Sequence, residues 1–595
     1  MSMTKRIPGI VGPVLALVLA GGCGTLNIVD NNDPDRARAL SDPATVEAIA
    51  VGAFQNWYLT GQGGFGEDQN PGLTLQVMAR SHAAMWNNFN IRFYTGCTNA
   101  DWDVYTLAAT NGTCGPQTEG PYYPRIEWQN NPASAQRTQI EAYWYGYYAS
   151  LSSANAVLNA IRTNNLVIQD AAHTKMVETM AALAQALDFS ALAMNYDQAF
   201  IVDYNTDLTT LQFSPASDVR DAAAAKLDEV IALATANTFS VPGKFFGSPG
   251  VAYTNVSIAQ IANTMAARNL AYFARNGTQT AAVDWTRVAG YASKGISSGA
   301  AFDLTFRQDG CNTWCDFLKV WTNDVTTMRI HTRVAHLMDP ATQPDPWDIT
   351  LNTNPNSPDK RLGDGTFRGD PGYASSVLDA LPDTTGNGGT DYVWVVGQEF
   401  GNKTRGAWHQ SAIGQVRYDS FPGCGDNPQG TGAPGVLDAP MVLAAENDLI
   451  WAEALIRGTP QDLATAATLI NKTRVGRGGL TPATAADLNL LDELQYEQSV
   501  ELPGSNTAPY YNMRRNDKLE PNTPHEYPVP AKELGVLQQP LYTCGGAANP
   551  DGSCGSHSAA VVAALVTDAP RVWADMQRQA WERLHHYGLK AALKQ

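Results

Sequence analysis

Apolar residues recur at alternating steps of four and three along several long segments of the chain, which is the spacing of one buried helical face. Between Gln136 and Arg162 this face comprises Ile140, Trp144, Tyr147, Leu151, Ala154, Leu158 and Ile161. Residues 173–197 repeat the pattern after a short polar turn. Two such helices form a hairpin, and the apolar face that the hairpin leaves open needs a further hairpin to cover it.

Further segments of the same kind follow along the chain. We expect helices at 217–237, 255–277, 284–297, 439–458, 459–479 and 484–502, with Asn276-Gly277 ending the second of these. Small Ala and Gly residues between the large apolar ones let neighbouring helices approach closely. The sequence therefore predicts a mainly α fold, a tetratricopeptide-like α-solenoid of helix hairpins.

The helical pattern fails between residues 301 and 438, where Gly, Pro, Asn and Asp dominate. A run of this length without periodic structure inside a compact chain is either functional or disordered. Its many aromatic residues favour order, because disordered segments are poor in such residues. We expect a loop-rich insertion packed on the solenoid, with short strands such as one within "DYVWVVG" at 391–397.

The first residues have the pattern of an export signal. Lys5 and Arg6 form a basic start, an apolar run follows from Ile10 to Ala20, and small residues precede Cys23. The run is too short to span a bilayer, which takes about 20 apolar residues. Small residues directly before a cysteine resemble a lipoprotein signal, which predicts lipidation of Cys23 and a membrane anchor made of acyl chains. A secreted protein with an unmodified cysteine is the alternative.

The chain is acidic, with 57 Asp and Glu against 40 Lys and Arg. Phosphate binding needs a basic stripe, and the sequence has none, so we expect no nucleic-acid partner. Attraction to an anionic lipid surface is disfavoured for the same reason.

The cysteines other than Cys23 lie in Gly-, Asn- and Thr-rich surroundings, which indicates local disulfides in an oxidising compartment. We predict pairing of Cys97 with Cys114, of Cys311 with Cys315, and of Cys544 with Cys554, and a free Cys424. A bridge from Cys424 to Cys311 or Cys315 is the alternative, because the "CNTWC" spacing is tight. Zinc is disfavoured, since no paired Cys-x-x-Cys or ligand-spaced His accompanies these residues.

Four motifs follow one another in the C-terminal part. They are "WAEALIRG" (451–458), "AATLINKTRVGRGGL" (466–480), "LDELQYEQSVEL" (491–502) and "YYNMRRNDKLEPNTPHEYPVPAKELGVL" (510–537). In this order they resemble the SusD/RagB family, which has an Ala-Glu-Ala helix, an Asn-x-x-Arg helix ending in Gly-Leu, a Glu-rich helix and an Arg-containing turn. The family's closing Pro-x-Pro-x-x-Glu-Leu stretch is matched by Pro528, Pro530, Glu533 and Leu534. Glu497-Gln498 stands where the family usually has Glu-Arg.

The resemblance implies a non-enzymatic capture protein, held by its lipid anchor on the cell-surface side of the outer membrane. Such a protein acts as the lid of a SusC-like TonB-dependent transporter and delivers an oligosaccharide or a peptide to it. Two bodies tethered to one membrane meet at a raised effective concentration. The implied division is a signal peptide (1–22), a tether and the start of the solenoid (23–50), the first part of the solenoid (51–300), a ligand-binding insertion (301–438), the family-like C-terminal helices (439–540), and a disulfide loop with an amphipathic tail (541–595).

Glycan recognition needs flat apolar faces for sugar C–H surfaces and planar polar groups for hydroxyls. Aromatic residues in loops beside Asn, Asp and Arg are therefore the candidates for ligand binding. These candidates are Trp86, Asn87, Trp102, Tyr105, Trp314, Trp321, Trp347, Trp394 and Trp408. Packing in a core or loop is the competing interpretation for each, and it is preferred for Trp144, Tyr147 and Trp451, which lie on periodic faces.

Two carboxylate pairs could serve acid/base chemistry, Glu446 with Asp448 and Glu497 with Glu501. All four lie on amphipathic segments, and we interpret them as solvated faces or contacts between helices. No nucleophile elbow or catalytic triad is recognisable, and we expect no catalytic residue, metal or cofactor. A secreted all-α glycoside hydrolase or lyase, and a solenoid scaffold for a surface protein assembly, are the alternative functions.

Overall fold

The computed structural model describes residues 36–62, 71–84, 127–128, 130–134, 137–247, 252–309, 313–323, 328–345, 354–366, 388–394, 411–418, 438–546 and 548–555. The predicted signal peptide, Cys23 and the tail 556–595 lie outside these residues. No helix within the described residues is long and apolar enough to cross a membrane.

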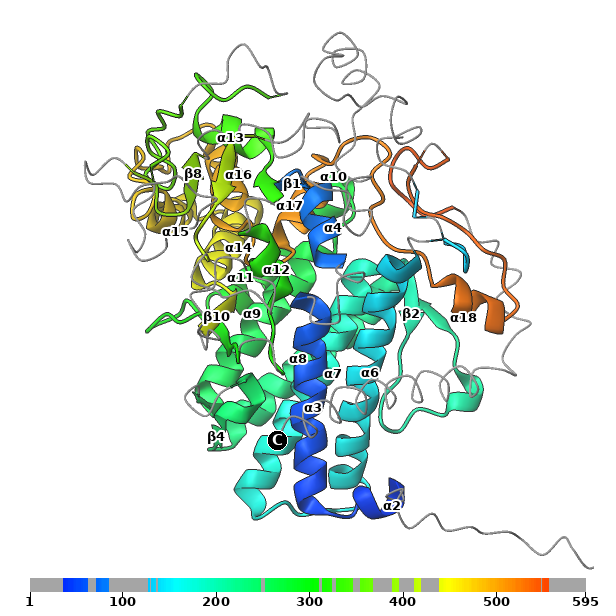
Figure 1. The fold of residues 1–595 in the computed structure, drawn as a ribbon. Helices are drawn as coiled ribbons and strands as arrows, with labels where there is room; N and C mark the ends of the chain where they lie inside the picture. Colours follow the sequence, from blue (N-terminus) through cyan, green and yellow to red (C-terminus); the bar gives the residue numbers. More distant parts are fainter. Residues whose placement is uncertain are drawn as a thin grey trace, which may run out of the picture.

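Long helices packed one on the next form the body of the protein (Figure 1). They are α3 (Pro43–Gln62), α6 (Arg137–Arg162), α7 (Ala171–Asn195), α8 (Ala216–Ala236), α9 (Asn255–Phe273), α11 (Trp285–Ala292), α14 (Ala444–Arg457), α15 (Leu463–Arg474) and α16 (Leu490–Glu501). Each packs against the next in this order. The predicted mainly α fold of stacked helix hairpins is confirmed.

Side-chain caps fix where several of these helices begin. The Asp170 carboxylate accepts a hydrogen bond from the His173 N–H at the start of α7, and the Thr254 hydroxyl accepts one from Ser257 at the start of α9. Each such cap satisfies an otherwise unpaired N–H and stabilises its helix by about 1 kcal/mol. The predicted apolar faces then bury themselves between neighbours: Trp144 and Tyr147 lie in the main core, and Trp451 is half-buried against it.

Several of the predicted boundaries are wrong. The helix predicted at 284–297 ends at Ala292, and the one predicted at 484–502 begins at Leu490. Asn276-Gly277 does not end α9, which stops at Phe273; the Asn276 side chain instead accepts from the Gln279 N–H and caps the short helix α10 (Gly277–Ala281). The segment 439–458 is not helical throughout, because β10 (Asp438–Val442) occupies its start. β10 pairs with a strand from a distant part of the chain. The local sequence of β10 does not encode this pairing.

That pairing closes the base of the insertion. β10 runs antiparallel to β6 (Leu304–Arg307), with Ala439 opposite Phe306, so the insertion leaves the solenoid and returns to it at one ladder. Within the insertion lie α12 (Phe317–Thr322), β7 (Met328–Ile330), α13 (Thr332–Met338), β8 (Tyr392–Trp394) and β9 (Ile413–Gln415). The strand predicted within 391–397 is confirmed as β8, which pairs with β9.

Short elements complete the described fold. They are α2 (Arg36–Ala39), α4 (Pro71–Met78), β1 (His82–Ala84), β2 (Gln198–Phe200), β3 (Phe213–Pro215), β4 (Ser240–Val241), β5 (Tyr253–Thr254), α17 (Ala508–Arg515), α18 (Ala531–Val536) and the 3-10 turns η2 (Leu208–Thr210) and η3 (Gly243–Phe246). β1 pairs with β7, which joins the N-terminal helices to the insertion.

A second, smaller core lies between the insertion and helix α16. It consists of Ile330, Val334, Ala335, Met338, Leu362, Tyr392, Ile413 and Val500. Val500 belongs to α16 and the other residues belong to the insertion, so this core fastens the insertion to the C-terminal helices.

The predicted disulfide between Cys544 and Cys554 is confirmed. Cys315 is also disulfide-bonded, and its partner lies outside the described residues. Cys97, Cys114, Cys311 and Cys424 lie outside them as well, so their predicted pairings stay predictions.

Candidate functional site

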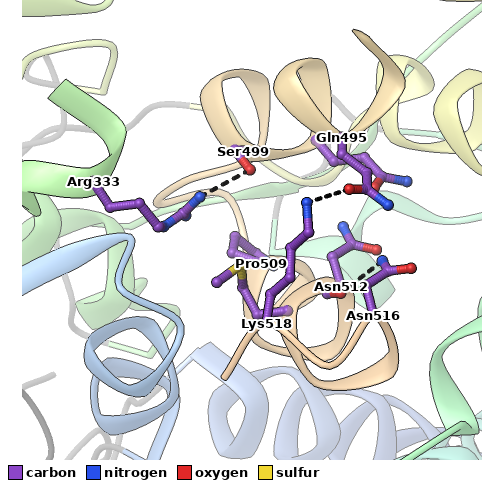
Figure 2. A pocket seen from close by; sticks show the side chains of 9 residues that line it. Arg333, Gln495, Ser499, Pro509, Asn512, Asn516 and Lys518 are labelled. Carbon is purple, nitrogen blue, oxygen red and sulfur yellow. Dashed lines mark hydrogen bonds between the residues drawn. The ribbon is translucent and has the colours of Figure 1, made fainter. Parts of the chain in front are cut away.

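A pocket of about 510 Å³ opens where α13, α16 and the chain beyond α17 meet the turn after α4. Its lining residues are Arg80, Arg333, Leu337, Asp492, Gln495, Tyr496, Ser499, Met513 and Lys518. Figure 2 shows the adjoining inner recess, which shares five of these residues and adds Gln498, Pro509, Asn512 and Asn516. The pocket therefore joins three parts of the chain that are far apart in sequence.

Helix α16 supplies the polar wall of the pocket. Asp492, Gln495, Tyr496 and Ser499 recur at steps of three, one and three, so they share one face. The opposite face carries Glu497 and Glu501, whose side chains are fully buried. One helix thus separates a ligand-accessible face from a buried ionic one.

The buried ionic face of α16 holds Arg361 of the insertion. The Arg361 guanidinium donates to Glu497 at 2.8 Å, to Glu501 at 3.1 Å and to Asp359 at 2.7 Å, and it has no exposed surface. Burial alone would lower the pKa of Arg361, but the Glu497 and Asp359 carboxylates raise it well above its ordinary value. This network fixes the orientation of α16 and so of the pocket wall.

Arg333 is the principal cation of the pocket. The His331 ring caps α13 by accepting a hydrogen bond from the backbone N–H of Arg333 at 3.0 Å. This cap sets the direction of the Arg333 side chain. The guanidinium donates to the Arg80 carbonyl at 3.2 Å and to the Ser499 hydroxyl at 3.2 Å (Figure 2). Burial, and then the neighbouring positive charge of Arg80, lower the pKa of Arg333 to about 9, although Asp345 acts in the opposite direction. Among the described residues no carboxylate forms an ion pair with Arg333.

Lys518 contacts the same polar face of α16. Its ammonium donates to the Gln495 side-chain carbonyl (Figure 2). Burial lowers the pKa of Lys518; the Asp492 carboxylate opposes this shift, and the charge of Arg333 adds to it. The third cation, Arg80, differs because it is neutralised by ion pairs with Asp345 at 2.9 Å and Glu520 at 2.6 Å.

Tyr496 is the aromatic residue of the pocket. Its hydroxyl donates to Asp359 at 2.7 Å, and the cations of Arg361 and Arg474 lie 5.9 and 6.0 Å from its ring centroid. Burial raises the pKa of Tyr496, so the phenol stays neutral and keeps its proton for this bond. The ring is held in place rather than free to rotate.

Comparisons with known proteins identify the fold. No protein-family model matches the sequence, and no curated protein matches it. Among solved structures, a SusD superfamily protein from Parabacteroides distasonis matches with a TM-score of 0.52 over 86% of this chain and 98% of its own, at 12% sequence identity. The chain has the fold of this SusD superfamily protein. The fold expected from the C-terminal motifs is therefore confirmed.

Two further solved structures give similar TM-scores. A SusD superfamily protein from Bacteroides vulgatus gives a TM-score of 0.49 at 12% identity, over 83% of this chain and 97% of its own. A SusD-like carbohydrate binding protein from Bacteroides fragilis gives 0.49 at 10% identity, over 80% and 86%. Of the three, the Parabacteroides protein has a TM-score above 0.5, and the fold assignment rests on it.

The family-like motifs hold this SusD-like fold together. Glu453 of α14 forms a buried ion pair with Arg515 of α17. Asn471 of α15 bonds the backbone of Ala483 through both its side-chain carbonyl and its side-chain amide, each at 2.8 Å. Glu533 of α18 accepts from the Tyr145 hydroxyl at 2.5 Å. These three contacts are structural. Other residues of the third and fourth motifs line the pocket, namely Asp492, Gln495, Tyr496, Ser499, Met513 and Lys518.

The structure describes three of the residues predicted to bind ligand. Trp314 is 6% exposed and packs against Tyr58 and Phe306, with ring centroids 5.7 and 5.8 Å away. This burial corrects the prediction for Trp314, because a core ring offers no face to a ligand. Trp321 is half-buried against the main core, and Trp394 is half-buried against the smaller core, beside which Tyr496 also packs.

The other predicted ligand residues, Trp86, Asn87, Trp102, Tyr105, Trp347 and Trp408, lie outside the described residues. Trp314 and Trp321 lie in or against the main core and Trp394 against the smaller one, so the described structure does not bring all three into one cluster. Sequence reasoning missed the pocket residues. The polar face of α16 is visible in the spacing of 492, 495, 496 and 499, whereas the positions of Arg80, Arg333 and Lys518 depend on tertiary packing.

The four carboxylates considered for acid/base chemistry are not on solvated faces. The Glu446 carboxylate bonds Arg268 at 2.9 Å, Asp448 bonds Lys472 at 2.9 Å, and Arg361 binds both Glu497 and Glu501. The expectation of a contact between helices is confirmed for Glu446 and Asp448, whereas Glu497 and Glu501 contact Arg361 in a turn of the insertion; the expectation of a solvated face is wrong for all four. Buried carboxylates are retained where a cation pairs with them, because an unpaired buried charge is costly. Within the described residues, no group of three His, Cys, Asp or Glu side chains is arranged to hold a metal ion.

Proposed function

We propose that the protein is a cell-surface lipoprotein of the outer membrane that captures oligosaccharide or peptide nutrients. It delivers them to a SusC-like TonB-dependent transporter and serves as the lid of that transporter. The observation that carries this proposal is the SusD-superfamily fold, shared over 86% of the chain. The lipoprotein-like sequence before Cys23 supports it independently, because a lid must be tethered at the membrane surface.

The pocket between α13, α16 and α17 is our proposed ligand site. A volume of about 510 Å³ is within the ordinary range for small-molecule sites, about 300 to 1,000 Å³. It offers hydroxyl and amide groups from Ser499 and Gln495 for ligand hydroxyls, and apolar surface from Leu337 and Met513 for C–H faces.

Several of the predicted aromatic residues adjoin this pocket along the chain. Trp86 and Asn87 follow β1 in sequence after one intervening residue, and β1 begins two residues after Arg80. Trp347 comes two residues after Asp345, the ion-pair partner of Arg80. All three residues lie outside the described part of the chain. We propose that they extend the surface of the pocket.

We further propose that the protein binds without turnover. Catalysis by paired acids needs carboxylates that face a substrate across a cleft, whereas Glu446, Asp448, Glu497 and Glu501 are held by cations inside the fold. Incubation of oligosaccharides with the protein should therefore release no products. Product release that depends on these carboxylates would favour a hydrolase or lyase instead.

Affinity capture of the full-length protein from detergent-solubilised outer membranes tests the main proposal. Mass spectrometry should recover a stoichiometric TonB-dependent barrel with the wild-type chain. Cys23→Ser is the matched control, because it removes the lipid attachment and leaves the described fold untouched, and it should recover much less barrel. Wild-type protein that carries its lipid and recovers no barrel would contradict the lid role and favour a scaffold or hydrolase.

A further inference from the structure

The pocket holds two cations, Arg333 and Lys518, that form no ion pair with any described residue of this strongly acidic protein. Arg333 and Lys518 both point at the polar face of α16, and their bonded acceptors there are the neutral Ser499 hydroxyl and the neutral Gln495 carbonyl (Figure 2). The chain has a net charge of −17, so carboxylates are plentiful elsewhere on it. Arg80 in the same pocket has two such carboxylate partners. Arg333 has no such partner among the described residues, so its guanidinium can pair with the anion of a ligand.

The two cations converge on one small region. Gln495 and Ser499 are four residues apart on α16, and side chains at this spacing lie about 5 to 6 Å apart at Cβ. Lys518 donates a hydrogen bond to Gln495, and Arg333 donates one to Ser499. The two cations come from different elements of the fold. The charge of Arg333 acts unfavourably on that of Lys518, and an anion bound between them would relieve this repulsion. A guanidinium also matches a carboxylate geometrically, because it can donate two parallel N–H bonds to its two oxygens.

The remaining lining suits a sugar better than a bare anion. Gln495, Ser499 and Asp492 offer donors and acceptors for hydroxyls, while Leu337 and Met513 offer apolar surface. When a ligand carboxylate accepts the hydrogen bonds of Arg333 and Lys518, the Ser499 hydroxyl and the Gln495 carbonyl are released. They can then bond to neighbouring hydroxyls of the ligand. A uronic acid carries a carboxylate and several hydroxyls on one ring.

We propose that the pocket selects oligosaccharides that contain uronic acid, with Arg333 and Lys518 binding the carboxylate. This inference rests on the proposed function, because it names the ligand class of the same site. It adds a charge requirement that a neutral-sugar or peptide site would not have.

Calorimetric titration of the folded full-length chain with matched probes tests the inference. The acidic probes are tetramers of galacturonate, glucuronate and mannuronate, the neutral probes are their methyl esters, and tetraglutamate is the acidic peptide. We expect at least one uronate tetramer to bind about tenfold or more tighter than its own methyl ester, the lower bound for a charge-assisted bond. Its affinity should fall between about 0.01 and 0.15 M salt, because screening weakens charge interactions at a partly open site.

Variants separate charge recognition from shape. Lys518→Gln changes an exposed residue and should fold normally, and Arg333→Gln removes the more buried cation. Each should weaken binding of the uronate tetramer about tenfold or more and weaken binding of the methyl ester much less. Arg287→Gln is the matched control, because Arg287 bonds Asp228 and Tyr291 on an exposed part of the solenoid, and it should change neither affinity.

The outcomes distinguish the inference from the proposed function. Equal binding of acid and ester, or loss of both in Lys518→Gln, overturns the uronate inference and leaves a neutral-sugar lid standing. Tighter binding of tetraglutamate than of any uronate also overturns it, and it assigns the site to acidic peptides. Failure of every probe, in protein that still captures the transporter, overturns the inference alone; failure of both measurements overturns the proposed function as well.

Discussion

Arg515 and Glu453 form an ion pair in which neither side chain is exposed, although 62 residues separate them in sequence. The guanidinium nitrogens Nη1 and Nη2 both donate to the carboxylate. The side-chain carbonyl of Asn512 accepts two further hydrogen bonds from Arg515. Burial opposes ionisation of Glu453, but Arg515 and then Arg457 outweigh it and lower its pKa to about 2. The pair joins α14 to α17 and so fixes one wall of the pocket.

Glu453→Gln should destabilise the protein by about 3 to 5 kcal/mol at neutral pH, because it leaves a buried guanidinium without its counter-charge. Chemical denaturation monitored by circular dichroism measures this difference. Arg457→Gln is the control, since Arg457 bonds the same carboxylate from a side chain that is 21% exposed and should cost about 1 kcal/mol or less. Similar losses in the two variants would show that burial does not decide the strength of the pair.

The stability of the protein should fall as the pH drops from about 6.5 to about 4. Burial lowers the pKa of His82 to about 4, against the smaller opposing effect of its hydrogen bond to Gln415. The unfolded chain binds a proton near pH 6.5, so the folded state binds fewer protons in this window and loses up to about 3 kcal/mol across it. Denaturation curves at pH 7, 5 and 4 measure the loss. His82→Gln should flatten the curve, and an unchanged slope in that variant would assign the loss to other groups.

Helix periodicity predicted most of the solenoid, because each helix buries a continuous face against its sequence neighbours. The prediction for α6 began at Gln136 and the helix begins at Arg137. Contacts between distant segments were not predictable in this way. The pairing of β6 with β10 and the attachment of Arg361 to α16 depend on which distant segments meet. The pocket is the extreme case, since its three cations come from positions 80, 333 and 518 and share no local pattern.

Gly146→Ala should destabilise the stack of α3 on α6. A Cβ at Gly146 would lie 2.3 Å from the Thr60 hydroxyl oxygen and 3.0 Å from the Thr60 Cβ, so the helices would have to move apart. Overpacking of this kind typically costs about 1 to 3 kcal/mol. Gly290→Ala is the matched control, because a Cβ there meets nothing within 4 Å on the exposed face of α11, and it should stabilise the protein by about 1 kcal/mol. Thermal unfolding distinguishes the opposite signs.

Loss of the disulfide between Cys544 and Cys554 should loosen the C-terminal end of the fold. The bridge closes a loop with a sequence separation of 10, for which the chain-entropy model gives about 3 kcal/mol. The bridged segment also receives a hydrogen bond from the Trp128 N–H to the Cys544 carbonyl at 3.1 Å, so its loss should expose residues 127–134 as well.

The double variant Cys544→Ser, Cys554→Ser measures this contribution cleanly, whereas a reductant would also open the bridge at Cys315. We expect a lower unfolding temperature and faster proteolysis after residue 540 in the double variant. Reductant added to the double variant should then lower the unfolding temperature further, by the share that belongs to the bridge at Cys315 and to the predicted bridge between Cys97 and Cys114. A double variant that unfolds at the wild-type temperature would mean that packing around Trp128 and Tyr527, whose ring centroids are 4.3 Å apart, holds this segment without the bridge.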